Sequence, residues 1–250
     1  MQSPVPSRNK DVSVRGVFVT GTGTGVGKTL VAAGLLKALT DSGVSALPVK
    51  PVQTGCPRID GKLSAPDLEF SLKAADLSPG EDLMDLMCPF RYSLACSPHL
   101  GGRMTGVYPD VETITGKMDQ LFEKCDYLIA EGAGGVMVPL NGSEKMLDLM
   151  VELNWPVVLV ARGDLGTINH SLLSLAALRN AGLRVAAVVV NHLTEDVSIV
   201  TRDNTHAIAQ YGDSVRVLEI AHMRNPEELA GNSSFMESMS GLCRSIMEQS

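Results

Sequence analysis

A glycine-rich segment near the N terminus carries the residues with the most specific chemistry. Residues 21–29 read GTGTGVGKT, so that Lys28 and Thr29 follow a run of alternating glycines. The backbone N–H groups of such a turn converge on an anion, the lysine binds phosphate and the hydroxyl binds Mg²⁺. Phosphate loops usually place four residues between the two glycines, but here five residues separate Gly21 from Gly27. We interpret the segment as a phosphate-binding loop with a longer spacer.

Three further charged residues stand where strands or helices are predicted to end or begin. Glu131 ends the apolar run YLIAE, and a carboxylate at such a strand end beside a phosphate loop commonly completes Mg²⁺ coordination. Lys50 ends the run VSALPVK and is followed by Pro51, which predicts a cation at the end of another strand. Asp67 follows Pro66 at the start of a predicted helix, where it could cap the helix or bind a metal ion.

The segment GDLGTINHSLL predicts a second anion site. Gly166 and Thr167 stand where a helix would begin, which leaves the N–H groups from Thr167 to Asn169 without helical partners. The positive end of the helix dipole favours a carboxylate at this place. Simple helix capping is the alternative that the sequence leaves open.

Short apolar runs, which position these residues, alternate with longer amphipathic runs. The pattern predicts strands at residues 16–20, 44–50, 126–131, 155–162, 183–191 and 214–220, the third of which runs into the glycines of residues 132–135. It predicts helices at residues 28–43, 67–75, 110–125, 167–182 and 195–212, and the helix at 67–75 is the one that it predicts between residues 51 and 110. Apolar strands separated by helices indicate an α/β fold with a single doubly wound, mostly parallel sheet and helices on both faces. We assign residues 15–250 to this one domain and residues 1–14 to a flexible tail.

Polar and glycine clusters directly follow four of the predicted strands. They lie at residues 21–29, 50–54 and 131–135, and at Asn191. Ligands of doubly wound sheets bind beyond the carboxyl ends of the strands. We therefore expect these clusters to meet at one edge of the sheet.

Composition and charge restrict the classes of function. The 250 residues carry a formal net charge of −7, so neither nucleic acid nor an anionic membrane is an expected partner. The N-terminal residues lack the apolar segment of a signal peptide, and no apolar run is long enough to span a bilayer. The five cysteines are widely spaced and form no C-x-x-C pair, which favours reduced thiols over a disulfide framework or a zinc site. We expect a soluble, cytoplasmic protein.

These motifs together resemble the dethiobiotin synthetase family over most of the chain, from residue 14 to residue 229. The resemblance rests on FVTGTGTGVGKT, KPVQTG, PDLEF, SPH, EGAGGVMVPL, VVLVARGDLGTINHSLL and VVVN, in this order. The five-residue spacer and the pairing of KPV with EGAGG are its most specific features. It implies a P-loop ligase that closes a ureido ring, in which 7,8-diaminononanoate, CO₂ and ATP give dethiobiotin, ADP and phosphate.

The resemblance also implies roles for individual residues. Lys50 matches the catalytic lysine of the family, with Lys28 on the phosphates. Mg²⁺ would bind to Thr29, Asp67 and Glu131, which favours metal binding over capping for Asp67. The triphosphate would bind to Gly25, Val26, Gly27, Lys28, Thr29 and Leu30. The diamine and the γ-phosphate would lie beside Thr24, Lys50, Thr54, Gly132, Ala133, Gly134 and Gly135.

Two further subsites are implied in the same way. Asn191 would read the adenine edge, with His192, Ala221, His222, Met223 and Glu227 on the adenine side. Leu165, Gly166, Thr167 and Asn169 would bind the substrate carboxylate across a homodimer interface, so that each active site would need both subunits. The chain departs from the family pattern at Ala221, where a proline is frequent, and at Gly25, where some members carry an acidic residue.

Three other interpretations compete with the ligase. A partition-type P-loop ATPase switch would carry a lysine at the position of Gly23, and its absence argues against that class. A related module of longer synthases or regulatory proteins would need extra domains that 250 residues cannot hold. A nucleotide-binding module without activity would not be expected to keep Lys28, Thr29, Lys50, Asp67 and Glu131.

Overall fold

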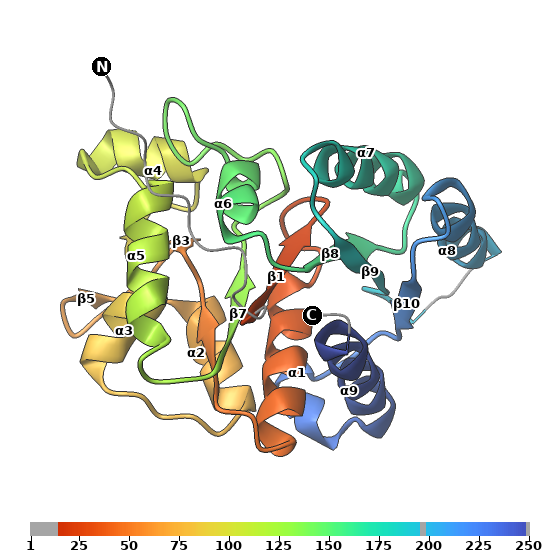
Figure 1. Cartoon of the computed structure of the whole chain (residues 1–250), viewed down its shortest axis with the longest axis horizontal. Helices are drawn as coiled ribbons and strands as arrows, with labels where there is room; N and C mark the ends of the chain where they lie inside the picture. Colours follow the sequence, from red (N-terminus) through yellow and green to blue (C-terminus); the bar gives the residue numbers. More distant parts are fainter. Residues whose placement is uncertain (1–14, 196–198, 249–250) are drawn as a thin grey trace.

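A six-stranded parallel sheet forms the centre of the computed structural model, which describes residues 15–195 and 199–248 (Figure 1). The strand order is β10-β9-β8-β1-β7-β2, and every neighbouring pair is parallel. The predicted tail at residues 1–14 lies outside the described residues, as do residues 196–198 of the last predicted helix. The strands are β1 (Gly16–Gly21), β2 (Ala46–Val49), β7 (Tyr127–Glu131), β8 (Val157–Arg162), β9 (Val185–Asn191) and β10 (Val217–Ile220).

Helices cover both faces of this sheet. They are α1 (Lys28–Asp41), α2 (Pro66–Ala74), α3 (Glu81–Met87), α4 (Pro98–Thr105), α5 (Val111–Leu121), α6 (Met146–Leu153), α7 (Thr167–Asn180), α8 (Ile199–Tyr211), the 3₁₀ helix η1 (Pro226–Gly231) and α9 (Ser233–Met247). Within the described ranges, no helix combines the length and the apolar character that crossing a membrane requires.

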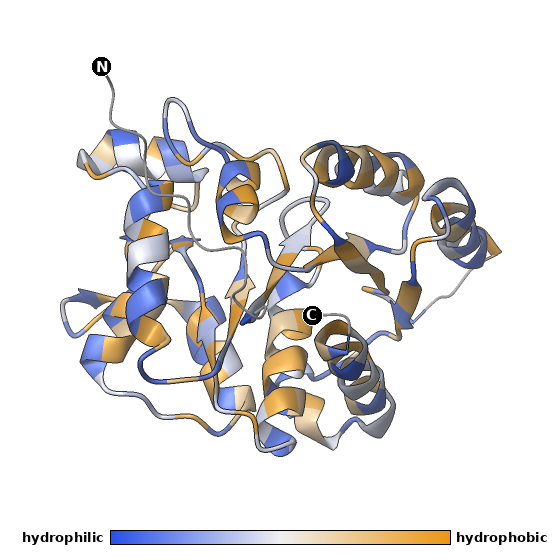
Figure 2. Ribbon diagram, in the orientation of Figure 1, coloured by the Kyte–Doolittle hydropathy of each residue, from blue (hydrophilic) through white to orange (hydrophobic). Residues whose placement is uncertain are grey.

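Alternate residues of the central strand feed two separate hydrophobic cores. Val17 and Val19 of β1 pack on the side of α1 and α9, whereas Phe18 packs on the side that includes α5, α6 and α7. Figure 2 shows hydrophobic residues along the central strands, as expected for a parallel sheet buried on both faces. The predicted doubly wound α/β fold is confirmed.

The six strands lie within the predicted ranges, apart from one extra residue at the end of β1, but the prediction missed the helices α6 and α9 and was wrong between residues 51 and 110. The strand predicted to end at Glu131 does end there, and the glycines after it form a turn. Residues 51–110 contain three helices instead of one, together with the short strands β3 (Val52–Thr54), β4 (Arg58–Ile59), β5 (Lys62–Leu63) and β6 (Phe90–Tyr92). These elements are too short to give a periodic signal.

The polar clusters meet at the carboxyl edge of the sheet, as expected. Gly21, Glu131 and Asn191 are the last residues of β1, β7 and β9, and Lys50 directly follows β2. Because β2, β7 and β1 are neighbours, the lysine, the glutamate and the glycine loop come from adjacent strands. Parallel pairing therefore brings together residues that lie far apart in the sequence.

Candidate active site

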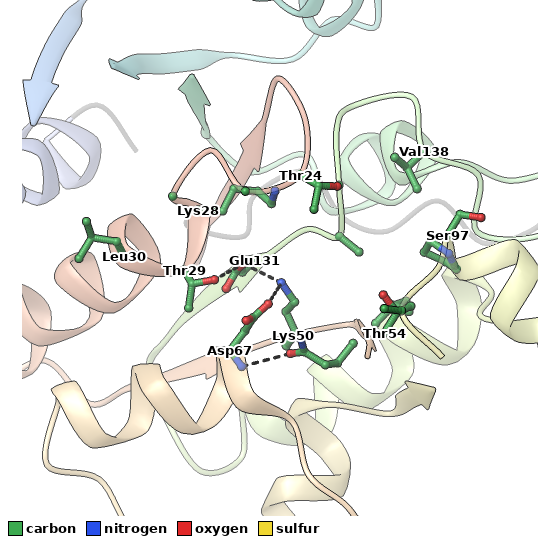
Figure 3. Close-up of a pocket in the computed structure, with 18 of the residues that line it drawn as sticks. Thr24, Lys28, Thr29, Leu30, Lys50, Thr54, Asp67, Ser97, Glu131 and Val138 are labelled. Atoms are coloured by element: carbon green, nitrogen blue, oxygen red, sulfur yellow. Dashed lines mark hydrogen bonds and ion pairs between the residues drawn. The ribbon is translucent and has the colours of Figure 1, made fainter. Parts of the chain in front are cut away.

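A cavity of about 810 Å³ opens at this edge of the sheet. Its size lies within the range of about 300–1,000 Å³ that is typical of small-molecule sites. The phosphate loop, the segments after β2 and β7, the start of α2 and the segment before α4 line it (Figure 3). The predicted residues among its lining are Thr24, Gly25, Gly27, Lys28, Thr29, Leu30, Lys50, Thr54, Asp67, Glu131, Ala133, Gly134 and Asn191.

The glycines of the phosphate loop are required by its backbone path. Gly25 and Gly27 have φ angles of 72° and 100°, a region that side chains strongly disfavour. A Cβ atom on Gly27 would also stand 2.1 Å from the amide nitrogen of Asn191. Gly27 precedes α1, and no side chain of the described residues caps this helix start. The loop thus leaves helix N–H groups available for an anion.

Lys28 lies beside this loop and is buried. Its Nζ donates a hydrogen bond to the carbonyl of Gly23 at 2.8 Å. Burial, and secondarily the positive charge of Lys50, lowers the pKa of Lys28 to about 8. A negatively charged ligand in the cavity would remove much of this penalty, because it would restore a favourable environment for the charged ammonium.

Lys50, Asp67 and Glu131 form a bonded cluster at the bottom of the cavity (Figure 3). The ammonium of Lys50 lies 2.7 Å from Asp67 Oδ2 and 2.6 Å from Glu131 Oε1. The hydroxyl of Thr29 donates to the same Glu131 oxygen at 2.9 Å. The three predicted metal ligands and the predicted catalytic lysine are therefore in direct contact.

Opposite charges in this cluster shift the pKa values of Lys50 and Asp67 in favour of their charged forms. Burial by itself would lower the pKa of Lys50, but the charges of Glu131 and Asp67 outweigh it and hold that pKa above its ordinary value. Burial would raise the pKa of Asp67, but the charge of Lys50 and its hydrogen bond keep that pKa below the ordinary value. Lys50 is therefore a cation and Asp67 an anion at neutral pH.

The oxygen ligands fit a magnesium ion. Among the described residues, no group of three or more histidine, cysteine, aspartate and glutamate side chains could hold a metal ion. Mg²⁺ is usually bound by one or two carboxylates, with substrate phosphates and water completing its shell. Thr29, Asp67 and Glu131 offer a hydroxyl and two carboxylates, all of them oxygen ligands, which contact one another directly or through Lys50.

The structure separates two interpretations of Asp67. The helix cap of α2 is Ala65, and Asp67 lies inside its first turn. The backbone N–H of Asp67 donates to the side-chain oxygen of Gln53 at 3.3 Å, while its carboxylate points to Lys50. Asp67 is thus directed into the cavity by its neighbours and is not the cap of its own helix.

Several residues of the cavity were not predicted as site residues. Gln53 positions Asp67 from the segment KPVQTG, and Ser97 lines the cavity from the segment SPH. Both segments had been noted in the sequence, but nothing in them indicated which side chain would face a ligand. Val52, Ala95, Cys96, Pro98, Val138, Leu193 and Pro226 also line the cavity.

Other predicted residues lie beside this cavity and do not line it. Val26 accepts a hydrogen bond from the amide of Asn191 at 3.1 Å, and the carbonyl of Gly132 lies 3.4 Å from Lys50 Nζ. His192 pairs with Glu219 at 2.9 Å. Glu227 pairs with Lys73 at 2.6 Å. Ala221, His222 and Met223 follow β10, and of this region only Pro226 reaches the lining.

The predicted carboxylate site lies at the start of α7, outside the first cavity. Gly166 has a φ of 93° and precedes the helix, where no described side chain provides a cap. The Thr167 hydroxyl is buried and has no hydrogen-bond partner within the described residues. Later residues of α7, His170 and Leu173, line a second cavity of about 500 Å³ together with Thr24 and Gly135. Leu165 and Asn169 are exposed.

The comparisons with known proteins point to one family. A family described as an AAA domain matches residues 15–230. The ATP-dependent dethiobiotin synthetase BioD of Anoxybacillus flavithermus is 33% identical over 85% of this chain and 94% of that protein. The enzyme of the same name from Thermodesulfovibrio yellowstonii is 38% identical over 70% of this chain and 75% of its own length. The chain belongs to the dethiobiotin synthetase family.

Solved structures of cell division ATPases share the fold of this chain. The cell division ATPase MinD of Pyrococcus furiosus aligns with a TM-score of 0.62 and 17% identity, covering 95% of this chain and all of that one. A chain of the MinC:MinD cell division complex of Aquifex aeolicus gives a TM-score of 0.61 and 15% identity over 94% of this chain and 96% of that one. At such identities the likeness shows the fold alone. The partition-type switch is supported only by this likeness.

Proposed function

We propose that this chain is an ATP-dependent dethiobiotin synthetase, a ligase that joins CO₂ to 7,8-diaminononanoate as a ureido ring. The observation that carries the proposal is the contact between Lys50, Asp67, Glu131 and Thr29 beside a phosphate loop. A member of this family with that arrangement has the groups that phosphoryl transfer requires.

The phosphate loop is proposed to hold the triphosphate of ATP. Gly25 and residues 27–30, with the buried ammonium of Lys28, line a cavity in which negative charge would be favourable. Thr29, Asp67 and Glu131 would hold Mg²⁺, which when bound neutralises phosphate charge. The side-chain nitrogen of Asn191 donates to the backbone carbonyl of Val26. The side-chain oxygen of Asn191 would then accept a hydrogen bond from the adenine amino group.

Ring closure is proposed to need no covalent enzyme intermediate. CO₂ first adds to one amine of the substrate, which loses a proton and becomes a carbamate. A carbamate oxygen then attacks the γ-phosphorus of ATP, which expels ADP and forms a carbamic–phosphoric mixed anhydride. The second amine attacks the activated carbonyl and expels phosphate. Lys28 and Lys50 provide the positive charge that brings two anions together, with Thr24, Thr54, Gly134 and Gly135 beside the diamine.

A homodimer is proposed to complete the site. The start of α7 has no side-chain cap among the described residues, although the N–H of Thr167 donates to the carbonyl of Asp164, and it lies outside the cavity of its own chain. Apolar side chains are exposed around it and beside the second cavity, with Leu165 89%, Leu173 63% and Met137 55% exposed. A second copy covering this surface would bury them and bring its own Leu165–Asn169 segment to the substrate carboxylate.

Residues 15–250 are proposed to act as one ligase domain in the cytoplasm. The two hydrophobic cores share a single sheet, and the family match spans residues 15–230. The net charge of −7 supports the expectation that neither nucleic acid nor a membrane is a partner.

The decisive experiment uses the full chain with ATP, Mg²⁺, bicarbonate and 7,8-diaminononanoate. We expect ADP release that depends on the diamine, and a product with the mass of dethiobiotin. Omission of the diamine or of bicarbonate serves as the control. ATP hydrolysis that is independent of the diamine would favour the switch ATPase, and no turnover at all would contradict the ligase.

A further inference from the structure

Four charged side chains crowd the lower part of the active-site cavity, and their charges cancel. Lys28, Lys50 and Glu131 are 6%, 4% and 4% exposed, and Asp67 is partly buried. Two ammonium groups and two carboxylates sum to zero. Of the two lysines, Lys50 pairs with both carboxylates, whereas Lys28 donates to the carbonyl of Gly23.

Lys50 uses carboxylate oxygens that a metal ion would also need. Its ammonium lies between Asp67 Oδ2 and Glu131 Oε1, at 2.7 Å and 2.6 Å. The second of these oxygens also accepts the hydrogen bond of Thr29. A divalent ion bound to Asp67 Oδ2 and Glu131 Oε1, at the distances of about 2.0–2.1 Å that Mg²⁺ requires, would overlap the ammonium that lies between these two oxygens. The two cations therefore compete for the same atoms.

We propose that Lys50 is an internal counter-ion that keeps free divalent cations off Asp67 and Glu131 and is released only by a metal–nucleotide complex. This inference rests on the proposed function of the site. A free divalent ion would add two uncompensated positive charges to a neutral and largely buried cluster, which is unfavourable.

A metal ion that arrives with ATP brings more negative charge than positive charge. The phosphates then offer Lys50 new partners at the moment when the metal ion takes the carboxylates. Lys50 moves from the metal ligands toward the phosphates, where a cation assists phosphoryl transfer. The metal ion thereby binds the carboxylates in the same step in which Lys50 moves to the phosphates, and it enters the site as its complex with the nucleotide.

The test measures Mn²⁺ binding to the full chain without nucleotide, by electron paramagnetic resonance and calorimetry. We expect weak binding to the wild type and binding stronger by about tenfold or more in Lys50→Met, a step worth about 1.4 kcal/mol. Mn²⁺ should raise the melting temperature of Lys50→Met and leave that of the wild type unchanged. Lys50→Arg keeps the charge and should resemble the wild type.

Lys28→Met is the matched control. It removes the same charge from the cluster but leaves the Lys50 bridges in place, so its Mn²⁺ affinity should rise less than that of Lys50→Met. Equal increases in the two variants would overturn the proposal, because charge alone would then explain them. Wild-type protein that binds free Mn²⁺ as tightly as Lys50→Met would overturn it as well.

A measurement on the wild type keeps the test valid if Lys50→Met does not fold. ADP should then strengthen Mn²⁺ binding well beyond the affinity of Mn²⁺ for ADP alone, whereas tight binding without ADP would contradict the exchange. None of these measurements uses diamine or bicarbonate. Failure of the cation exchange is therefore distinguishable from failure of the proposed ligase activity.

Discussion

The starts of α1 and α7 are locally alike but differ in their surroundings. Each helix has 14 residues and follows a glycine with positive φ, Gly27 at 100° and Gly166 at 93°. Neither start is capped by a side chain of the described residues. Both are therefore able to bind an anion through backbone N–H groups.

Their surroundings give the two helix starts different tasks. The start of α1 lies among Lys28, Lys50 and Glu131, which are buried and come from three segments of the chain. At the start of α7, Leu165 is exposed, and the neighbouring Arg162 and Asp164 pair with each other at the surface. A helix start thus provides an anion site, but catalytic charge depends on what the tertiary structure brings beside it.

The largest expected effect is the loss of turnover in Lys50→Ala. This change removes a positive charge from the α1 side, where it would bring carbamate and γ-phosphate together. We expect kcat for dethiobiotin formation to fall by roughly 100-fold to 1,000-fold, the scale of a lost electrostatic group in an active site. Lys37→Ala, a lysine of α1 that pairs with Asp41, is the control and should keep normal turnover. Near-normal turnover in Lys50→Ala would remove Lys50 from the mechanism.

The next largest expected effect is a difference in the free energy of unfolding between changes at the α1 cluster and changes at the start of α7. Glu131→Ala leaves Lys50 without one of its two carboxylates in a buried site, and should lower the free energy of unfolding by about 3 kcal/mol. Asn169→Ala, at the exposed start of α7, should change it by less than about 0.5 kcal/mol. Urea unfolding of the nucleotide-free protein measures both values. Equal effects would mean that the α1 cluster has no special energetic role.

Asn169→Asp sharpens the comparison from the side of α7. The new carboxylate would repel the substrate carboxylate, so KM for the diamine should rise by about tenfold while ADP affinity stays unchanged.

Mixing Asn169→Asp with Lys50→Ala tests whether each active site uses groups from both subunits. If the second copy provides the α7 start, subunit exchange should restore about one quarter of the sites. No recovery after demonstrated exchange would place both groups in one chain.

The smallest expected effect is a pH dependence of protein stability that comes from Lys28 at the start of α1. The pKa of Lys28 is lowered to about 8 in the folded protein, whereas its ordinary value is 10.5. Between these two values the unfolded chain holds the proton and the folded chain loses it, so this lysine makes stability rise with pH in that window. Bound phosphate should raise the pKa of Lys28 again.

Calorimetry in buffers of different ionisation enthalpy measures the predicted proton. ADP binding near pH 8 should take up a fraction of one proton in the wild type. Lys28→Arg, which stays charged at every pH of interest, should take up none from this position. The same proton uptake in both proteins would assign it to another group.

Much of the fold was readable from the sequence because its signals are local. The apolar strands and the long helices α1 and α7 were predicted, and so was the gathering of Gly21, Glu131 and Asn191 at one edge. The helix α9 was missed although Phe235, Met239, Leu242 and Ile246 give it a buried, helix-period face. The short elements between residues 51 and 110 gave no comparable pattern, since their position depends on contacts with the sheet.

The sequence by itself determined the phosphate loop, its unusual spacer and the residue types that phosphoryl transfer needs. These features depend on neighbours in the chain, because glycine conformations and helix starts are local properties. Only the tertiary structure decided that Lys50 bridges Asp67 and Glu131, and that Gln53 accepts the backbone N–H of Asp67. Such contacts join segments as many as 81 positions apart, and burial then determines the charge each group carries.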